Sequence, residues 1–198
     1  MTAEAVLAEP SRSMRLRLGT HATHEKLDKR IMSADPFGGL DHYATFLRVQ
    51  HALHGRVDRY YLDPRLEALL PGLSTRRRLD SVLKDFEDVS GELPVPAVEA
   101  DEPVDVPTAL GWLYVVEGSN LGAAILLKAA TKTLGLSETF GARHLAGHAD
   151  GRALHWRNFT AALDAISLQP EEDERAIEGA RQAFAFVYDL VEREMPRA

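Results

Sequence analysis

Apolar residues recur at spacings of three and four along most of this chain, which is the pattern of helices that bury one face. The first such stretch, from about Ser13 to Met32, carries Leu16, Thr20, His24, Leu27 and Ile31 on one predicted face. The second runs from about Leu40 to Tyr61 and would bury Tyr43, Phe46, Leu47 and Leu53. Convincing period-two alternation is absent, so the sequence predicts helices rather than strands.

Proline and glycine punctuate these stretches and set the predicted boundaries. Asp35–Gly39 ends the first helix, Asp63-Pro64 ends the second, and a short helix reaches Leu70. The later predicted elements are a helix capped by Ser74 through about Val89, an extended connector from Leu93 to Asp105, and helices from Pro107 to Leu134, Arg152 to Ile166 and Pro170 to Glu194. The fold class is therefore all-α, a single domain of about seven helices over residues 1–198, with residues 1–12 as an N-terminal tail.

Composition narrows the function classes. The 198 residues include no cysteine, which excludes disulfides, thiolate nucleophiles and iron–sulfur ligation. A formal net charge of −7 argues against general nucleic-acid binding. No uninterrupted apolar run has the length of a membrane span, and the N-terminus shows no secretory signal. We expect a cytoplasmic monomer without nucleic-acid or membrane partners.

Two glycines, Gly118 and Gly122, lie four residues apart inside a predicted helix. Each costs about 1 kcal/mol relative to alanine, so the position must benefit from a missing side chain. With Ala123 and Ala124 they leave one side of the helix nearly bare. Such a surface lets a flat ligand approach the backbone, but it equally serves close packing between helices. The helix alone leaves both interpretations open.

The histidines limit the chemistry further. No histidine has a glutamate three residues before it, so the di-iron pattern of helical bundles is missing. The His-Glu-x-x-His zinc motif and the Gly-x-Ser-x-Gly nucleophile motif are also absent. The remaining possibility for a histidine site is one imidazole acting on a large cofactor such as haem. His24 suits this role better than His21 because it falls on the predicted apolar face.

Several segments together resemble the haem oxygenases of Gram-negative bacteria. They are Thr20–Asp28, the helix from Phe46 to Tyr61, Gly111–Ala124, Phe140–Ala146 and Gly151–Phe159. The resemblance covers nearly the whole chain in the expected order. It implies a haem oxygenase-like bundle in which haem lies between the first, proximal helix and a glycine-kinked distal helix.

The resemblance also implies roles for single residues. His24 matches the proximal iron ligand, and Gly118 and Gly122 match the distal glycines that leave room for dioxygen. Arg17, Tyr114 and Arg157 match positions that contact the haem propionates. Asn120 stands where animal members have an aspartate that orders distal water, so this part of the catalytic site departs from theirs.

The implied reaction opens haem, which is both cofactor and substrate, to biliverdin, carbon monoxide and ferrous iron. The β/δ-cleaving variant of the family lacks the basic residue and the tyrosine at positions 17 and 114, so the resemblance predicts biliverdin IXα. Electrons would come from an external reductase or ferredoxin docking near the basic residues Arg15, Arg17, Lys26 and Lys29, and the product would serve iron acquisition or bilin supply. A haem-trafficking protein of the same fold and a cofactor-free interaction domain remain the alternatives.

Overall fold

The computed structural model describes residues 9–91 and 103–195. Within these ranges the chain forms α-helices and short 3-10 helices, and pairing of extended backbone is limited to isolated bridges around Ser137. The elements in order are α1 (Arg12–Met32), α2 (Leu40–Tyr61), α3 (Pro64–Leu69), η1 (Leu73–Arg76), α4 (Leu79–Ser90), α5 (Val106–Leu134), η2 (Arg143–Leu145), α6 (Arg152–Ala165) and α7 (Pro170–Glu194). The all-α prediction is confirmed.

Side-chain hydrogen bonds to the backbone cap the first turns of several helices near the predicted start positions. The Asp105 carboxylate accepts a hydrogen bond from the backbone N–H of Thr108 at the start of α5. At α7, Gln169 and Glu172 form a reciprocal capping box around Pro170. Residues 1–8 of the predicted tail and most of the predicted connector lie outside the described residues. Arg12 belongs to α1 rather than to the tail, because Ser11 provides the cap.

The prediction of one helix from Ser74 to Val89 is wrong. Ser74 lies inside the 3-10 helix η1, and α4 begins only at Leu79. The left-handed backbone of Gly72 at φ 81° and the extended backbone of Arg77 bracket a separate turn. Because a serine followed by polar residues fits either structure, the sequence pattern did not distinguish a tight turn from a helical cap.

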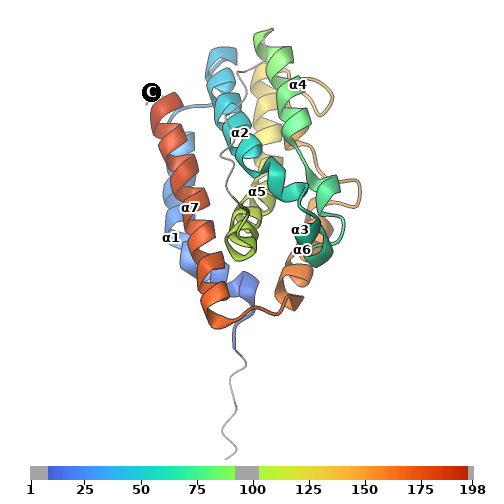
Figure 1. The fold of residues 1–198 in the computed structure, drawn as a ribbon. Helices are drawn as coiled ribbons and strands as arrows, with labels where there is room; N and C mark the ends of the chain where they lie inside the picture. Colours follow the sequence, from blue (N-terminus) through green and yellow to red (C-terminus); the bar gives the residue numbers. More distant parts are fainter. Residues whose placement is uncertain (1–8, 92–102, 196–198) are drawn as a thin grey trace, which may run out of the picture.

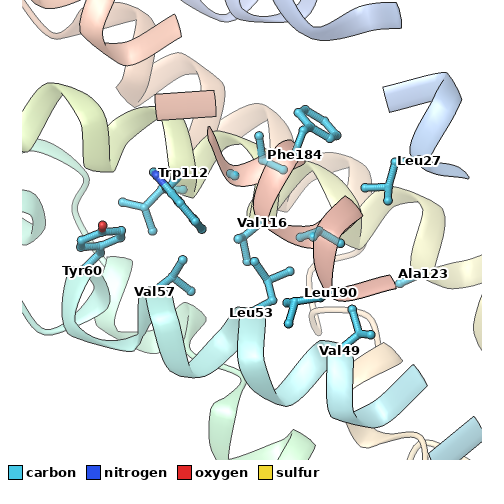
Figure 2. Packing of buried hydrophobic residues seen from close by; sticks show 14 of the residues in the cluster. Leu27, Val49, Leu53, Val57, Tyr60, Trp112, Val116, Ala123, Phe184 and Leu190 are labelled. Carbon is cyan, nitrogen blue, oxygen red and sulfur yellow. The ribbon is translucent and has the colours of Figure 1, made fainter. Parts of the chain in front are cut away.

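Helix α7 lies against α1, α2 and α5 and runs beside α1 along one side of the bundle (Figure 1). Side chains from α2, α5 and α7 meet in the buried cluster that Figure 2 shows, with Leu53, Val116 and Leu190 at its middle. Helix α6 packs on α5 and α1, whereas direct contact between α1 and α5 is sparse. The two helices that matter for the predicted site are therefore held mainly by a third helix, α7.

Ion pairs fasten the basic first helix to α7. Arg12 and Arg15 both contact the carboxylate of Asp173, at 2.6 and 2.8 Å, and Arg30 contacts Glu192 at 2.5 Å. Arg12 and Arg30 are nearly fully buried, and breaking such buried pairs is costly. Much of the positive charge of α1 is thus neutralised within the fold rather than offered to a partner.

Among the described helices, α5 has the length and apolar composition of a membrane-crossing helix, although Glu117 and Lys128 interrupt its apolar run. Its side toward α7 is buried in the core, and its other side is partly exposed. Such a core helix passes a test of length and hydropathy without crossing a bilayer.

Candidate functional site

The glycines of α5 fall into two groups with different surroundings. A Cβ atom at Gly111 would overlap the backbone carbonyl of Ala176 on α7, and one at Gly179 of α7 would overlap the carbonyl of Thr108. These two glycines allow α5 and α7 to pack backbone against backbone. A Cβ at Gly122 would meet nothing within 4 Å, and one at Gly118 would make only ordinary contact, 3.4 Å, with Trp156. Close helix packing therefore explains Gly111 and leaves Gly118 and Gly122 unexplained.

The surface around Gly122 is exposed and apolar. Leu121 is 42% exposed and Ile125 is 74% exposed, and Gly122 and Ala124 are exposed between them. Large aliphatic side chains exposed together on a core helix mark a surface suited to an apolar ligand. The bare side of α5 therefore has the composition that a flat, mostly apolar molecule requires.

His24 lies at the edge of the buried face of α1 rather than within it, and the prediction that it lies on that face is corrected here. The core face comprises Leu16, Thr20 and Leu27, whereas the His24 side chain is 57% exposed. One ring edge packs on the buried Phe184 of α7, with centroids 5.7 Å apart. In a helix of 3.6 residues per turn, positions 24 and 27 point about 60° apart. The imidazole is therefore largely exposed, although the start of the side chain remains packed.

The two nitrogens of His24 have different surroundings. Nδ1 lies 3.3 Å from the Oδ2 atom of Asp28, one turn further along α1. A carboxylate at Nδ1 favours the tautomer that carries its proton on Nδ1. The lone pair of Nε2 is then free to bind a metal. In His21 it is Nε2 that lies near a carboxylate, 3.8 Å from Glu25. This geometry favours His24 over His21 as a ligand.

Arg17 and Tyr114 come together at a cavity of about 190 Å³ between α1, α5 and α6. Trp156 and Thr160 of α6 line it as well, and the Trp156 ring lies 5.4 Å from that of Tyr114. Burial raises the pKa of Tyr114, and the Arg17 guanidinium partly offsets that rise. A cationic guanidinium beside a neutral phenol forms a site with hydrogen-bond donors for a carboxylate.

Arg157 is not brought into this cavity. It lies on α6 directly after Trp156, but its side chain is exposed and does not line the pocket. Arg17, in contrast, lies on the same side of α1 as His24, seven residues or about 10 Å away along the helix. The structure thus brings Arg17 and Tyr114 together at one cavity and leaves Arg157 outside it.

Asn120 contacts α6 through its backbone carbonyl. Its carbonyl oxygen accepts a hydrogen bond of 2.8 Å from Nη1 of Arg152, and Nη2 of the same guanidinium donates to the carbonyl of Leu145. A side-chain donor on a carbonyl in the middle of a helix is a usual cause of bending. Arg152 therefore ties the segment between Gly118 and Gly122 to α6 and to the loop before it.

A buried ionic network below the glycines was missed by sequence reasoning. Glu117 is 2% exposed and accepts hydrogen bonds of 2.8 Å from the Tyr61 hydroxyl and from Nη1 of Arg76. Arg76 also donates to the backbone carbonyl of His155. The available signal was a lone glutamate inside an apolar helix, because a buried carboxylate needs partners. The network fixes the residue that immediately precedes Gly118.

These features fit haem by their chemistry. Among the described residues no three histidine, aspartate or glutamate side chains gather as a metal site. Haem needs only one imidazole from the protein, because the macrocycle supplies the other iron ligands. A porphyrin needs apolar surface for its faces and donors for its two carboxylates. The Leu121–Ile125 surface offers the first, and the Arg17–Tyr114 cavity offers the second.

The arrangement defines an all-helical protein with an exposed imidazole on α1, a bare apolar surface on α5 and a cavity that offers donors for a carboxylate. Comparison with known proteins agrees with that class. The profile of the family described as heme oxygenase matches residues 11–193, and the chain belongs to the haem oxygenase family of oxidoreductases.

Individual relatives support this assignment. The chain is 42% identical to heme oxygenase PigA of Pseudomonas aeruginosa over 187 residues, which is 92% of each chain. It is 30% identical to a heme oxygenase of Xanthomonas campestris, covering 78% of this chain and 91% of the relative. The crystal structure of the NO- and CO-bound heme oxygenase of Neisseria meningitidis superposes with a TM-score of 0.88 at 41% identity, covering 96% of this chain and 94% of that one. The heme oxygenase of Leptospira interrogans shares the fold, with a TM-score of 0.76 at 18% identity.

Proposed function

We propose that this chain cleaves haem at the α-meso carbon and releases biliverdin IXα, carbon monoxide and ferrous iron. The observation that carries the proposal is the separation of the glycines. Gly111 and Gly179 pack helices together, whereas Gly118 and Gly122 face open space or a single aromatic ring. A helix that accepts two destabilising glycines without a packing reason is consistent with a ligand at that surface.

His24 is the proposed iron ligand. Its Nε2 atom is available for a bond to iron, and Asp28 near Nδ1 would orient the ring. The Phe184 edge restricts rotation of the imidazole on its other side. Bound haem supplies the iron that activates dioxygen and is itself the molecule that is cut.

On the other side of a bound haem, Gly118 and Gly122 would offer bare backbone, whereas the Asn120 side chain, two residues from each, lies on the far side of the helix. The missing side chains would leave a small volume in which dioxygen has limited freedom of direction. Leu121 and Ile125 exclude bulk water from the edge of that volume. Asn120, held through its carbonyl by Arg152, keeps this segment of α5 in place.

Arg17 and Tyr114 are proposed to hold the propionates and thereby to set the rotation of haem in its plane. That rotation would determine which meso carbon lies next to the distal glycines, so both residues together would select the α position. Arg157 is exposed near this end and is proposed as a secondary contact that reaches the propionates from α6. Chromatography of the product tests this assignment, and a predominant β or δ isomer would contradict it.

Titration with hemin tests the ligand. His24→Ala should weaken binding and shift the Soret band, whereas the matched variant His21→Ala, one turn earlier and 61% exposed, should bind as the wild type does. Reducing the ferric complex under air then tests the reaction. Loss of the Soret band with a rise in biliverdin absorption supports cleavage, and persistence of the band supports a haem-trafficking protein instead.

A further inference from the structure

A second cavity, of about 320 Å³, lies between η1, the start of α4 and the loop before α6. Four arginines line it, Arg76, Arg77, Arg78 and Arg143. In the part of the chain that the structure describes, no aspartate or glutamate lines the same cavity. Three of them pair with carboxylates that lie behind the cavity wall, Glu117, Asp58, Asp85 and Asp88, so the lining itself offers guanidinium donors to an anion while most of their charge is balanced from behind.

Its guanidinium groups keep unused donors. Arg77 pairs with Asp58 through Nε and Nη2, both at 2.9 Å, which leaves Nη1. Arg143 contacts Asp85 and Asp88 through Nη1, which leaves Nε and Nη2. The internal ion pairs therefore orient these two side chains without using all of their N–H groups.

Arg78 differs from the other three. Its Nη1 atom donates to the backbone carbonyls of His144 and Ala146 at 2.7 and 3.0 Å, and among the described residues it forms no ion pair with a carboxylate. It is partly buried, and this burial lowers its pKa, while the nearby Glu117 carboxylate and the Tyr61 hydroxyl act in the opposite direction. A partly buried cation that no carboxylate touches directly gains stability from an anion that enters from solution.

The rest of the lining suits a compact oxyanion. Ser81 adds a hydroxyl donor, whereas the Thr75 hydroxyl donates to the carbonyl of Gly72, and the imidazoles of His148 and His155 stack at 4.2 Å at the side of the cavity. Donors that approach from several directions fit a tetrahedral phosphate, whereas a planar carboxylate is satisfied by a single guanidinium fork. The small volume and the acidic remainder of the chain do not suit a nucleic acid strand.

We propose that this cavity is a binding site for a phosphate group, free or carried by a small molecule, with Arg77, Arg78 and Arg143 as its principal donors. None of these residues holds haem in the function proposed above, so the two proposals can fail separately. Arg76 lines the cavity and also supports Glu117, which places the phosphate site next to the residue before Gly118.

The test is a titration of the full chain with sodium phosphate and, separately, with glycerol 3-phosphate, at fixed pH and with sodium chloride holding the ionic strength constant. Binding should raise the melting temperature in a saturable way. The imidazole NMR signals of His148 and His155 should move, while those of His21 and His42 stay in place. Tighter binding of the ester would identify a small-molecule phosphate, and tighter binding of free phosphate would identify the inorganic ion.

Arg77→Gln is the informative variant, and Arg65→Gln is its matched control. Both arginines form a two-point pair with an aspartate, Asp58 and Asp63 respectively, but only Arg77 lines the cavity. Phosphate affinity should fall about tenfold in Arg77→Gln, because one charge-assisted donor is lost. It should be unchanged in Arg65→Gln.

Ser81→Ala, which removes a hydroxyl and no charge, provides a second variant if Arg77→Gln does not fold, and it should also weaken phosphate binding. The proposal is overturned if chloride alone reproduces the rise in melting temperature. It is equally overturned if Arg77→Gln binds phosphate as the wild type does, or if Arg65→Gln weakens binding as much as Arg77→Gln.

Discussion

The guanidinium of Arg152 holds the backbone carbonyl of Asn120, at a distance of 2.8 Å, midway between the two glycines of the distal helix. The donor comes from the first turn of α6, so the position of the distal segment depends on a side chain outside α5. Burial lowers the pKa of Arg152, as expected for a cation whose hydrogen-bond partners are carbonyls rather than carboxylates. This contact makes Arg152 a positioning residue for the proposed reaction.

Replacing Arg152 by methionine should lower stability by about 2 kcal/mol, because two hydrogen bonds from a charged donor are lost. Haem affinity should change little, whereas the isomer distribution of biliverdin should broaden as the segment at Asn120 becomes less well placed. Urea unfolding and product chromatography measure the two effects. Arg193→Met, at an exposed position, is the control, and an unchanged isomer pattern in Arg152→Met would contradict the positioning role.

The two groups of glycines predict opposite responses to added side chains. Gly111→Ala should destabilise the fold by about 1–3 kcal/mol, because the new methyl group meets the α7 backbone. Gly122→Ala should instead stabilise the helix by up to about 1 kcal/mol, since its Cβ enters open space and alanine favours helix. Thermal unfolding measures both changes.

Gly122→Leu tests whether the exposed glycine surface is needed for haem degradation. It should fold normally in the absence of haem but slow haem degradation, because the side chain would occupy the volume above the ring. Normal turnover in Gly122→Leu would show that the exposed glycine surface is not the distal face.

Periodicity was sufficient to predict the long helices, because each buries a regular stripe, as the Leu53 and Val57 positions of α2 illustrate. Periodicity did not predict features in which a residue depends on partners far away in the sequence. Glu117 and Arg76 are 41 residues apart, so no local pattern links them. The same limitation applied to Gly111, whose role depends on the Ala176 backbone of another helix. His24 was assigned to the core face because the heptad-like spacing does not resolve the edge of a helix face from its centre.

Acid should destabilise the protein through His54. Burial, with positive charge on His144 and Arg78, lowers the pKa of His54 to about 3 from an ordinary value of 6.5. The folded state therefore keeps this imidazole neutral, while the unfolded chain takes up a proton below pH 6.5. Stability due to His54 is complete above pH 6.5 and declines as the pH falls toward 3, by about 1.4 kcal/mol at pH 5.5.

His54→Leu should remove this contribution. Nδ1 of His54 has no hydrogen-bond partner in the described structure, so an apolar replacement leaves no partner unsatisfied there. Urea unfolding at pH 7.5 and pH 5.5 measures the difference, and His42→Gln controls for loss of an exposed imidazole. If the wild type and His54→Leu lose equal stability between these pH values, His54 does not carry the effect.

Electron delivery provides the last prediction, because the structure divides the basic residues of α1 by function. Arg15 is paired with Asp173 on α7, and Arg17 lines the proposed propionate cavity. Lys26 and Lys29 are exposed and form no ion pair among the described residues, and the Lys26 ammonium lies over the Tyr188 ring of α7 at 4.3 Å. These two lysines are therefore the proposed contact for an acidic reductase or ferredoxin.

Lys26→Gln combined with Lys29→Gln should slow turnover strongly at about 0.01 M salt and little at about 1 M, where charges beyond a few ångströms are screened. Ascorbate, which needs no docking surface, should reduce the variant and the wild type equally. Equal slowing at both salt concentrations would place the donor elsewhere on the protein.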